Sequence, residues 1–491
     1  MIRRFFSLSV SLLVGFLFLF GCSPSKPEPF LVGEIAPDEF DPEMWGKVYP
    51  LHYESWLKTR DPKPAGKSKY KRGWDDDLIV YDKLSEFPFL ALLYNGWGFG
   101  IEYNEPRGHY FAVTDQLEID PSRVSPGGVC LGCKTPFHRQ MSETHGMDYL
   151  KKPFREAVAM LPEKLRELGP ACYDCHQPDP MALTTKKAHL EDGLLMIAKP
   201  DPARQELRSL ACAQCHVTYI VPRDNQMKVA GDIMLPWRYG KWGDIAIEGI
   251  IQDLLSDDSR LEWTQKVTGF KMPFIRHPEF ELFSKGSVHF NAGVACADCH
   301  MPYTRVGGYK ISDHDVTSPL KADLRACAQC HTQSREWLEQ RIHHTQDRTA
   351  SLILRAGYAA ATCAKLFETL HGAQQGGAAI DTALYNEAKQ SYLQAFLRLV
   401  FINAENSTGF HNPAEAGRVL GDAIAFAGRS EALLRQLLAG TGSDPGLEVA
   451  LELGTYLTDR GEAGLNFVPD QEFPDPFGIQ RHFLSDQAKG L

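Results

Sequence analysis

Five Cys-x-x-Cys motifs constrain this 491-residue chain more than any other feature. Four of them are followed directly by histidine, and the first is followed by lysine. They read Cys130-Leu-Gly-Cys133-Lys134, Cys172-Tyr-Asp-Cys175-His176, Cys212-Ala-Gln-Cys215-His216, Cys296-Ala-Asp-Cys299-His300 and Cys327-Ala-Gln-Cys330-His331. Cys-x-x-Cys-His is the attachment signature of c-type haem, in which the thiols form thioethers and the histidine ligates the iron. We therefore predict five covalent haems c, one of which, next to Lys134, differs in kind from the others.

Zinc is the competing interpretation, because structural zinc sites also use paired Cys-x-x-Cys spacing. The histidine that follows each second cysteine favours haem instead. Ten of the twelve cysteines belong to the motifs, which leaves Cys22 and Cys363. Cys363 lies among alanines in a helical pattern, so we expect a buried packing thiol there.

The N-terminus has the pattern of a secretory signal. Arg3 and Arg4 precede an apolar run that ends in Leu19-Phe20-Gly21-Cys22, and this predicts a signal peptide over residues 1–21. Leu-x-Gly-Cys resembles the bacterial lipobox, so we expect Cys22 to be lipidated and to anchor the protein on the periplasmic side of a membrane. An ordinary signal peptide with a chance cysteine is the alternative. No other segment reaches about 18 continuous apolar residues.

Beyond the signal peptide, residues 22–37 are rich in Pro, Ser and Glu and are typical of a tether. We expect residues 38–491 to form one mainly α domain with little sheet and a core packed around haem. Apolar residues at helical spacing predict long helices over 335–371, 382–401, 413–438 and 445–458. This helical part, about 335–460, fits either a simple core bundle or a subunit interface.

The formal net charge is −10, which makes nucleic acid an unfavourable partner. A small anionic substrate would instead need a local basic pocket.

Iron ligation demands more histidines than the motifs supply. Haems that only carry electrons need a second strong axial ligand, so four more histidines are required. The sequence does not choose them from its remaining histidines: His52, His109, His138, His145, His189, His277, His289, His314, His343, His344, His371, His411 and His482.

Lys134 indicates a different role for the first haem. An ammonium cannot donate to iron, so binding requires the neutral amine, which burial beside a ferric centre favours. We expect this haem to keep an open face for substrate. The alternative is a lysine that merely replaces histidine on another electron-carrying haem.

Together these residues resemble one family, the pentahaem cytochrome c nitrite reductases, which form ammonia. The landmarks are Tyr49-Pro50-Leu51-His52-Tyr53-Glu54-Ser55, Tyr103-Asn104-Glu105-Pro106-Arg107-Gly108-His109, the lysine motif followed by four histidine motifs, and His277-Pro278-Glu279. The resemblance implies a mostly α-helical domain that dimerises through its long C-terminal helices. It also implies distal axial ligands: His314 for the haem on Cys172 and Cys175, His109 for that on Cys212 and Cys215, His411 for that on Cys296 and Cys299, and His289 for that on Cys327 and Cys330.

Around the open iron, the resemblance implies an Arg, a Tyr and a His. Tyr219 and His277 match the last two, and Arg123 is the best match for the first, with Arg107 as the alternative. The family commonly binds calcium beside this site through a Glu, a Lys and a Gln, whose positions are occupied here by Thr218, Phe274 and Arg276. Because hard Ca²⁺ needs six or more oxygen ligands, we expect no calcium at this site. Arg276 would supply positive charge there or make an ordinary salt bridge.

The activity that the resemblance implies is the six-electron reduction of nitrite to ammonium at the Lys134 haem. Arg123 and His277 would hydrogen-bond the nitrite oxygens, and His277 would donate protons, since imidazole titrates near neutral pH. Tyr219 would hold the later intermediates. Electrons would come from a membrane quinol-oxidising cytochrome or a soluble multihaem donor. A pure electron conduit and a hydroxylamine-converting multihaem enzyme are the alternatives.

Overall fold

The computed structural model describes residues 29–71, 82–120, 127–178, 181–458 and 473–480. The predicted signal peptide, Cys22, Arg123 and His482 lie outside these ranges. Within them, no helix combines the length and the apolar character needed to cross a membrane.

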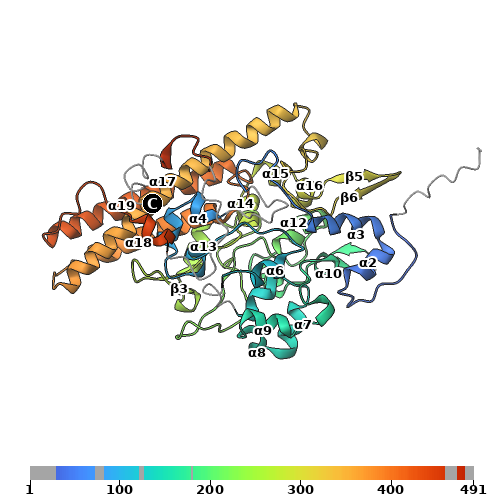
Figure 1. The fold of residues 1–491 in the computed structure, drawn as a ribbon, viewed down its shortest axis with the longest axis horizontal. Helices are drawn as coiled ribbons and strands as arrows, with labels where there is room; N and C mark the ends of the chain where they lie inside the picture. The colour runs from blue at the N-terminus through green and yellow to red at the C-terminus, as the bar shows by residue number, and fades with distance from the viewer. Residues whose placement is uncertain (1–28, 72–81, 121–126, 179–180, 459–472, 481–491) are drawn as a thin grey trace, which may run out of the picture.

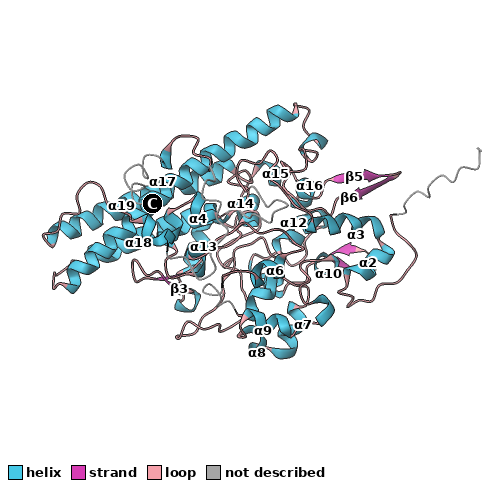
Figure 2. Cartoon of the chain, in the orientation of Figure 1, coloured by secondary structure: helices cyan, strands magenta, loops and turns pink. Residues whose placement is uncertain are grey.

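The fold is mainly α, as predicted, and Figure 2 shows how little sheet it contains. Three antiparallel pairs make up the strands of the described residues: β1 (His176–Gln177) with β2 (Ala182–Leu183), β3 (Trp263–Thr264) with β4 (Lys271–Met272), and β5 (Tyr303–Val306) with β6 (Tyr309–Ser312). Most helices before residue 335 are short: α2 (Pro42–Val48), α3 (Pro50–Leu57), α4 (Lys83–Glu86), α5 (Phe89–Leu93), α6 (Ala112–Leu117), α7 (His138–His145), α8 (Met147–Leu150), α9 (Phe154–Ala159), α10 (Cys172–Cys175), α11 (Ala188–Met196), α12 (Arg204–Ala213), α13 (Ile247–Leu254), α14 (Glu279–Ser284), α15 (Val288–Asn291) and α16 (Cys296–His300). The 3₁₀ turns are η1 (Lys58–Arg60), η2 (Gly98–Gly100), η4 (Gly128–Cys133), η5 (Glu163–Leu165), η6 (Asp258–Arg260) and η7 (Cys327–Gln329).

Three long helices form a bundle at one end of the molecule (Figure 1): α17 (Arg335–Gln375), α18 (Thr382–Ala404) and α19 (Pro413–Gly440). Each begins where a polar side chain accepts hydrogen bonds from its first turn, at Ser334, Asp381 and Asn412. α19 packs against both other helices. Cys363 is fully buried in this bundle, and its sulfur lies 3.2 Å from the carbonyl oxygen of Ala427.

The three long helices match their predicted ranges to within four residues at either end, but the fourth prediction was wrong about where its helix begins. α20 covers only Leu453–Thr458 rather than 445–458. Gly446 has a φ of +71°, and its amide donates to the Asp444 side chain. The Arg435 guanidinium donates to the carbonyls of Gly446 and Leu447. These contacts commit the backbone to a turn where the apolar pattern indicated a helix.

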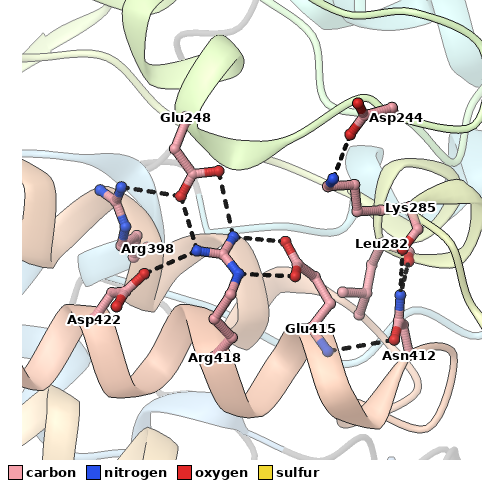
Figure 3. Close-up of polar contacts among 9 residues, drawn as sticks. All are labelled: Asp244, Glu248, Leu282, Lys285, Arg398, Asn412, Glu415, Arg418 and Asp422. Carbon is pink, nitrogen blue, oxygen red and sulfur yellow. Dashed lines mark hydrogen bonds and ion pairs between the residues drawn. The ribbon is translucent and has the colours of Figure 1, made fainter.

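A polar network fixes the N-terminus of α19 against the rest of the protein (Figure 3). The Arg418 guanidinium contacts Glu248 of α13, and Glu248 also contacts Arg398 of α18. The Asn412 side chain donates to the carbonyls of Leu282 and Lys285, at 3.2 and 2.7 Å. The segment that enters α19 is thereby held from two sides.

Candidate haem-binding and active site

One continuous cavity of about 2960 Å³ runs through the region of short helices. Pockets for ordinary ligands measure about 300–1,000 Å³, so this cavity is several times larger. All ten motif cysteines, with free thiols, line it together with Lys134 and the four motif histidines.

The donor set fits haem rather than zinc. In the described ranges, the only cluster of three or more close metal-ligating side chains is His216, His277 and Glu279, which contains no cysteine. A structural zinc site would instead gather four ligands, most often with cysteines among them. Thiol pairs spread along one large cavity, each with its own imidazole or amine, suit five covalent porphyrins.

Three pairs of histidine rings face each other at a separation that fits one iron. Metal–imidazole bonds of about 2 Å on either side, added to the two ring radii, give a similar distance. The ring centroids are 6.2 Å apart in each case, between His176 and His314, between His300 and His411, and between His289 and His331. These are three of the four pairs that the family resemblance implied.

The fourth implied pair is His109 with His216, and both side chains line the cavity. Burial and the nearby charge of His216 together lower the pKa of His109 to about 4. His109 is therefore held as neutral imidazole, the form that can donate to iron. His216 also lies beside His277, with ring centroids 6.1 Å apart.

Most of the other candidate histidines lie away from the cavity. His138 contacts Asp232 at 2.9 Å, and His189 contacts the carbonyl of Gln214 at 2.7 Å. Neither lines the cavity wall, nor do His145, His343, His344 or His371. His52 does line it, with its ring 5.4 Å from that of His314.

Carbonyl and carboxylate oxygens orient several of the facing imidazoles through Nδ1, which leaves Nε2 for metal. The Nδ1 atoms of His300 and His314 each lie 2.9 Å from a backbone carbonyl. His411 Nδ1 lies 2.6 Å from Oε1 of Glu405, whose side chain is fully buried. Burial alone would lower the pKa of His411, but this carboxylate raises it to about 9. The Glu405 carboxylate thus lies on the Nδ1 side of the ring.

Tyr219, Arg276 and His277 line the cavity together with Lys134, which follows η4 and lies close enough to His277 to act on its charge. His277 has a φ of +49°, and about half of its side-chain surface faces the cavity. Burial lowers the pKa of His277 and raises that of Tyr219. Tyr219 therefore remains a phenol that can donate a hydrogen bond. Arg123 lies outside the described residues, and Arg107 lines the cavity with its guanidinium paired to Asp115 and Glu118.

Arg276 is paired with a carboxylate that the sequence did not indicate. Its guanidinium binds both oxygens of Glu262, at 2.9 and 2.6 Å, and both side chains are buried. The same guanidinium lies over the ring of Tyr219, 5.0 Å from the centroid, and contacts the Tyr219 carbonyl at 3.4 Å. The expected positive group is present, but its charge is largely compensated by Glu262.

Two further groups at the site were missed at the sequence level. Arg223 lines the cavity near Cys130, and its buried Nε has no hydrogen-bond partner in the described part of the chain. Glu279 lies between two rings, with its oxygens 3.7 Å from His216 Nδ1 and 3.9 Å from His277 Nδ1. Burial opposes ionisation of Glu279, yet these histidines hold its pKa well below the usual range. Glu279 belongs to the His277-Pro278-Glu279 landmark, although no role was predicted for it, and the only sequence signal for Arg223 was its position four residues after Tyr219.

Fold and site together define a multihaem c-type cytochrome. The sequence profile of the cytochrome c552 family matches residues 41–481, so the chain belongs to this family.

Among its relatives, the cytochrome c nitrite reductase subunit NrfA of Nitratidesulfovibrio vulgaris is 33% identical, covering 83% of this chain and 82% of the relative. Cytochrome c-552 of Maridesulfovibrio salexigens is 28% identical, over 82% and 76%. A solved structure of cytochrome c nitrite reductase from Desulfovibrio desulfuricans, described for the relevance of two calcium sites, is similar with a TM-score of 0.72. It is 27% identical, covering 83% of this chain and 88% of that one.

Proposed function

We propose that this protein is a cytochrome c nitrite reductase that reduces nitrite to ammonium by six electrons. One observation carries the proposal: the single motif with lysine instead of histidine lines the cavity close to Tyr219, Arg276 and His277, near enough for their charges to interact. Relatives that are named as nitrite reductases support the same activity. An electron conduit would need no such arrangement, and the relatives do not favour it.

When bound, the haem on Cys130 and Cys133 supplies the iron that takes up nitrite and the electrons that reduce it. His277 faces this part of the cavity, with Glu279 on its Nδ1 side. When His277 is protonated to the imidazolium, which Glu279 favours, Nε2 can donate a hydrogen bond and a proton to a nitrite oxygen. Tyr219 donates from its phenol, and Arg123 adds a charge-assisted hydrogen bond. Positive and donor groups aimed at an anion in a dry pocket favour N–O cleavage.

The test is the ammonium formed per nitrite consumed by haem-loaded protein, with a reduced viologen as electron donor. We expect one ammonium per nitrite at sustained turnover. Negligible nitrite consumption by protein that carries five low-spin haems would favour the electron-conduit alternative. Oxidation of hydroxylamine without nitrite reduction would favour the hydroxylamine-converting alternative.

We further propose that this site needs no calcium. The guanidinium of Arg276 contacts the carboxylate of Glu262 and the carbonyl of Tyr219, both of which are oxygen donors of the kind that Ca²⁺ uses. A fixed cation would thus take the place of a metal cation. Activity should survive exhaustive chelation and remain unchanged on adding Ca²⁺. A loss of activity with a chelator that Ca²⁺ restores would contradict this proposal.

For its cellular setting, we propose a periplasmic lipoprotein that is anchored through Cys22 and forms a homodimer through α17, α18 and α19. The lipobox-like sequence supports the anchor, and the long helices at one end of the molecule (Figure 1) support the interface. The electron donor would be a membrane quinol-oxidising cytochrome or a soluble multihaem protein. Mass spectrometry of the mature N-terminus and the solution mass of the haem-loaded protein test the anchor and the dimer.

A further inference from the structure

A buried lysine beside the Lys134 motif also contacts a second haem motif. Lys187 is the N-cap residue of α11, and it is only 4% exposed. Its ammonium lies 2.9 Å from Oδ1 of Asp174, within the second motif, and donates to the carbonyl of Thr135 at 2.7 Å. Thr135 directly follows Lys134 and is fully buried. One cation therefore connects the loop of the first motif to the helix of the second.

Gln214, within the third motif, completes the connection. Its Oε1 accepts from the backbone N–H of Lys187 at 3.1 Å, and its Nε2 donates to the carbonyl of Asp174 at 2.8 Å. Gln214 is 1% exposed. Thr135, Asp174, Lys187 and Gln214, here called the Lys187 cluster, thus join three haem attachment segments by direct hydrogen bonds and one ion pair.

Stability alone is a weak reason for such a cluster. Desolvation of a buried ion pair offsets most of its Coulomb attraction, and replacement by apolar groups is often neutral or even stabilising. A buried polar group that is hydrogen-bonded to a backbone carbonyl instead holds that backbone in one geometry. Here that backbone is next to Lys134, the residue whose nitrogen must reach the iron.

We propose that Lys187 is a positioning residue for Lys134: through the carbonyl of Thr135 it holds the loop on which the lysine ligand sits, in register with the second and third haems. The inference rests on the proposed role of Lys134 as an axial ligand. A misplacement of about 1 Å in a catalytic group can cost about 100-fold in rate, so loss of this hydrogen bond should act on the first haem and spare the others.

The experiment compares two variants that differ only at residue 187. Asp174→Asn keeps the ammonium on the Thr135 carbonyl but leaves it without its carboxylate, which should lower stability, whereas Lys187→Met/Asp174→Asn removes both charges. Lys186→Met is the matched control, because the neighbouring lysine packs over the Tyr173 ring instead, with its ammonium 4.6 Å from the centroid. We would measure haem content, the high-spin electron paramagnetic resonance signal of the first haem, its midpoint potential and the kcat and KM for nitrite.

With five haems attached, the double variant should show a shifted or split high-spin signal, a shifted first-haem potential and a kcat lowered at least about tenfold. KM and the four low-spin signals should stay as in the wild type. Asp174→Asn and Lys186→Met should keep the wild-type high-spin signal. Selective loss of the first haem in the double variant would also support the proposal. If that variant does not accumulate, Lys187→Gln, whose amide ends one bond short of the ammonium position, carries the same expectation.

An unchanged high-spin signal and potential in the double variant, or in Lys187→Gln, would overturn the inference and leave the proposed function standing. Wild-type protein without any high-spin signal would instead overturn the role of Lys134 itself.

Discussion

Buried carboxylates decide which side chains of this site carry net charge. Glu262 uses both of its oxygens on Arg276, so that guanidinium contributes little uncompensated charge to the cavity. Glu279 lies beside His277 and polarises it without neutralising a fixed cation. Arg223 has no such carboxylate of its own among the described residues. Arg223 is therefore a cavity-lining cation that makes no ion pair in the described ranges, and it can attract an anion.

Replacing His277 should abolish most turnover while leaving the cytochrome intact. In His277→Ala we expect nitrite reduction to fall about 10²–10⁴-fold, the usual contribution of a general acid, with five haems still attached. Viologen-linked turnover and haem content are the measurements. His371→Ala is the control, because that histidine bonds to the Tyr385 hydroxyl, 2.9 Å away in the bundle, and does not line the cavity. Full activity in His277→Ala would refute the proton-donor role.

Arg223 should affect nitrite more than a neutral substrate. In Arg223→Gln we expect the KM for nitrite to rise about tenfold, equivalent to about 1.4 kcal/mol, with kcat nearly unchanged. Hydroxylamine carries no negative charge, so its KM should not change. Arg238→Gln is the control, since Arg238 is paired with Asp253 and lies off the cavity wall. Equal effects on both substrates would mean that Arg223 acts on a haem propionate or on the fold rather than on nitrite.

Glu281 should make the protein less stable as pH rises. Its Oε1 accepts from Thr218 N and Trp237 Nε1, while its buried Oε2 has no partner in the described ranges. Burial raises the pKa of Glu281 from its ordinary value of 4.5 to about 8. Between pH 4.5 and 8, the Glu281 carboxyl is ionised in the unfolded chain but protonated in the folded protein. The free energy of unfolding therefore falls by about 1.4 kcal/mol for each pH unit in this interval.

Glu281→Gln should remove that slope. Guanidinium unfolding midpoints of wild type and variant, compared at pH 5.5 and 7.5, isolate the contribution of this one carboxyl, since the other groups titrate alike in both. We expect the wild type to lose more stability than the variant over this interval. Parallel losses would show that Glu281 is already ionised in the folded protein.

At the scale of elements, the N-terminus of α19 connects the helical bundle to the haem region. Asn412 caps α19 and donates to two carbonyls at the end of α14, while Arg418 joins α19 to Glu248 of α13 (Figure 3). Asn412 is buried, whereas Arg418 is 42% exposed. His411, which faces His300, is the residue just before the cap, so this junction also positions a haem ligand.

The two contacts should differ in their effect on stability. Asn412→Ala loses an N-cap worth about 1 kcal/mol and leaves buried carbonyls unpaired at about 1–3 kcal/mol, so we expect about 2–4 kcal/mol of destabilisation. It should also perturb the low-spin signal of the haem on Cys296 and Cys299. Arg418→Ala should cost at most about 1 kcal/mol despite its several ion pairs, because exposed pairs are screened. Denaturant midpoints and electron paramagnetic resonance of both variants check this, and the reverse ranking would contradict it.

Across the whole molecule, the features that can be predicted from the sequence are those encoded by the spacing of residues close together in the chain. Cys-x-x-Cys-His marks attachment within five residues, and the 3.6-residue period marks α17, α18 and α19. Burial of a carboxylate has no such local pattern. Glu262 meets Arg276 across fourteen positions, and Glu405 becomes the partner of His411 only because the segment between α18 and α19 turns back on itself. The prediction of a helix over 445–452 was wrong for a related reason. Side-chain contacts to the backbone there stabilise a turn, although the apolar pattern indicates a helix.

At the scale of the whole molecule, we also expect that the chain cannot fold completely without its haems. Without haem, the apolar side chains around this cavity of about 2960 Å³ have no porphyrin to pack against. Because only about 5–15 kcal/mol keeps a domain folded, the loss of that burial should unfold this region. Haem-free chain, made in the cytoplasm without residues 1–21, should therefore be cleaved rapidly by protease between residues 127 and 331 and should bind a hydrophobic dye. The bundle over 335–440 has its own apolar core and should retain helical circular dichroism. The haem-loaded protein is the control, and a protease-resistant haem-free chain with a cooperative unfolding transition would show that side chains alone can close the cavity.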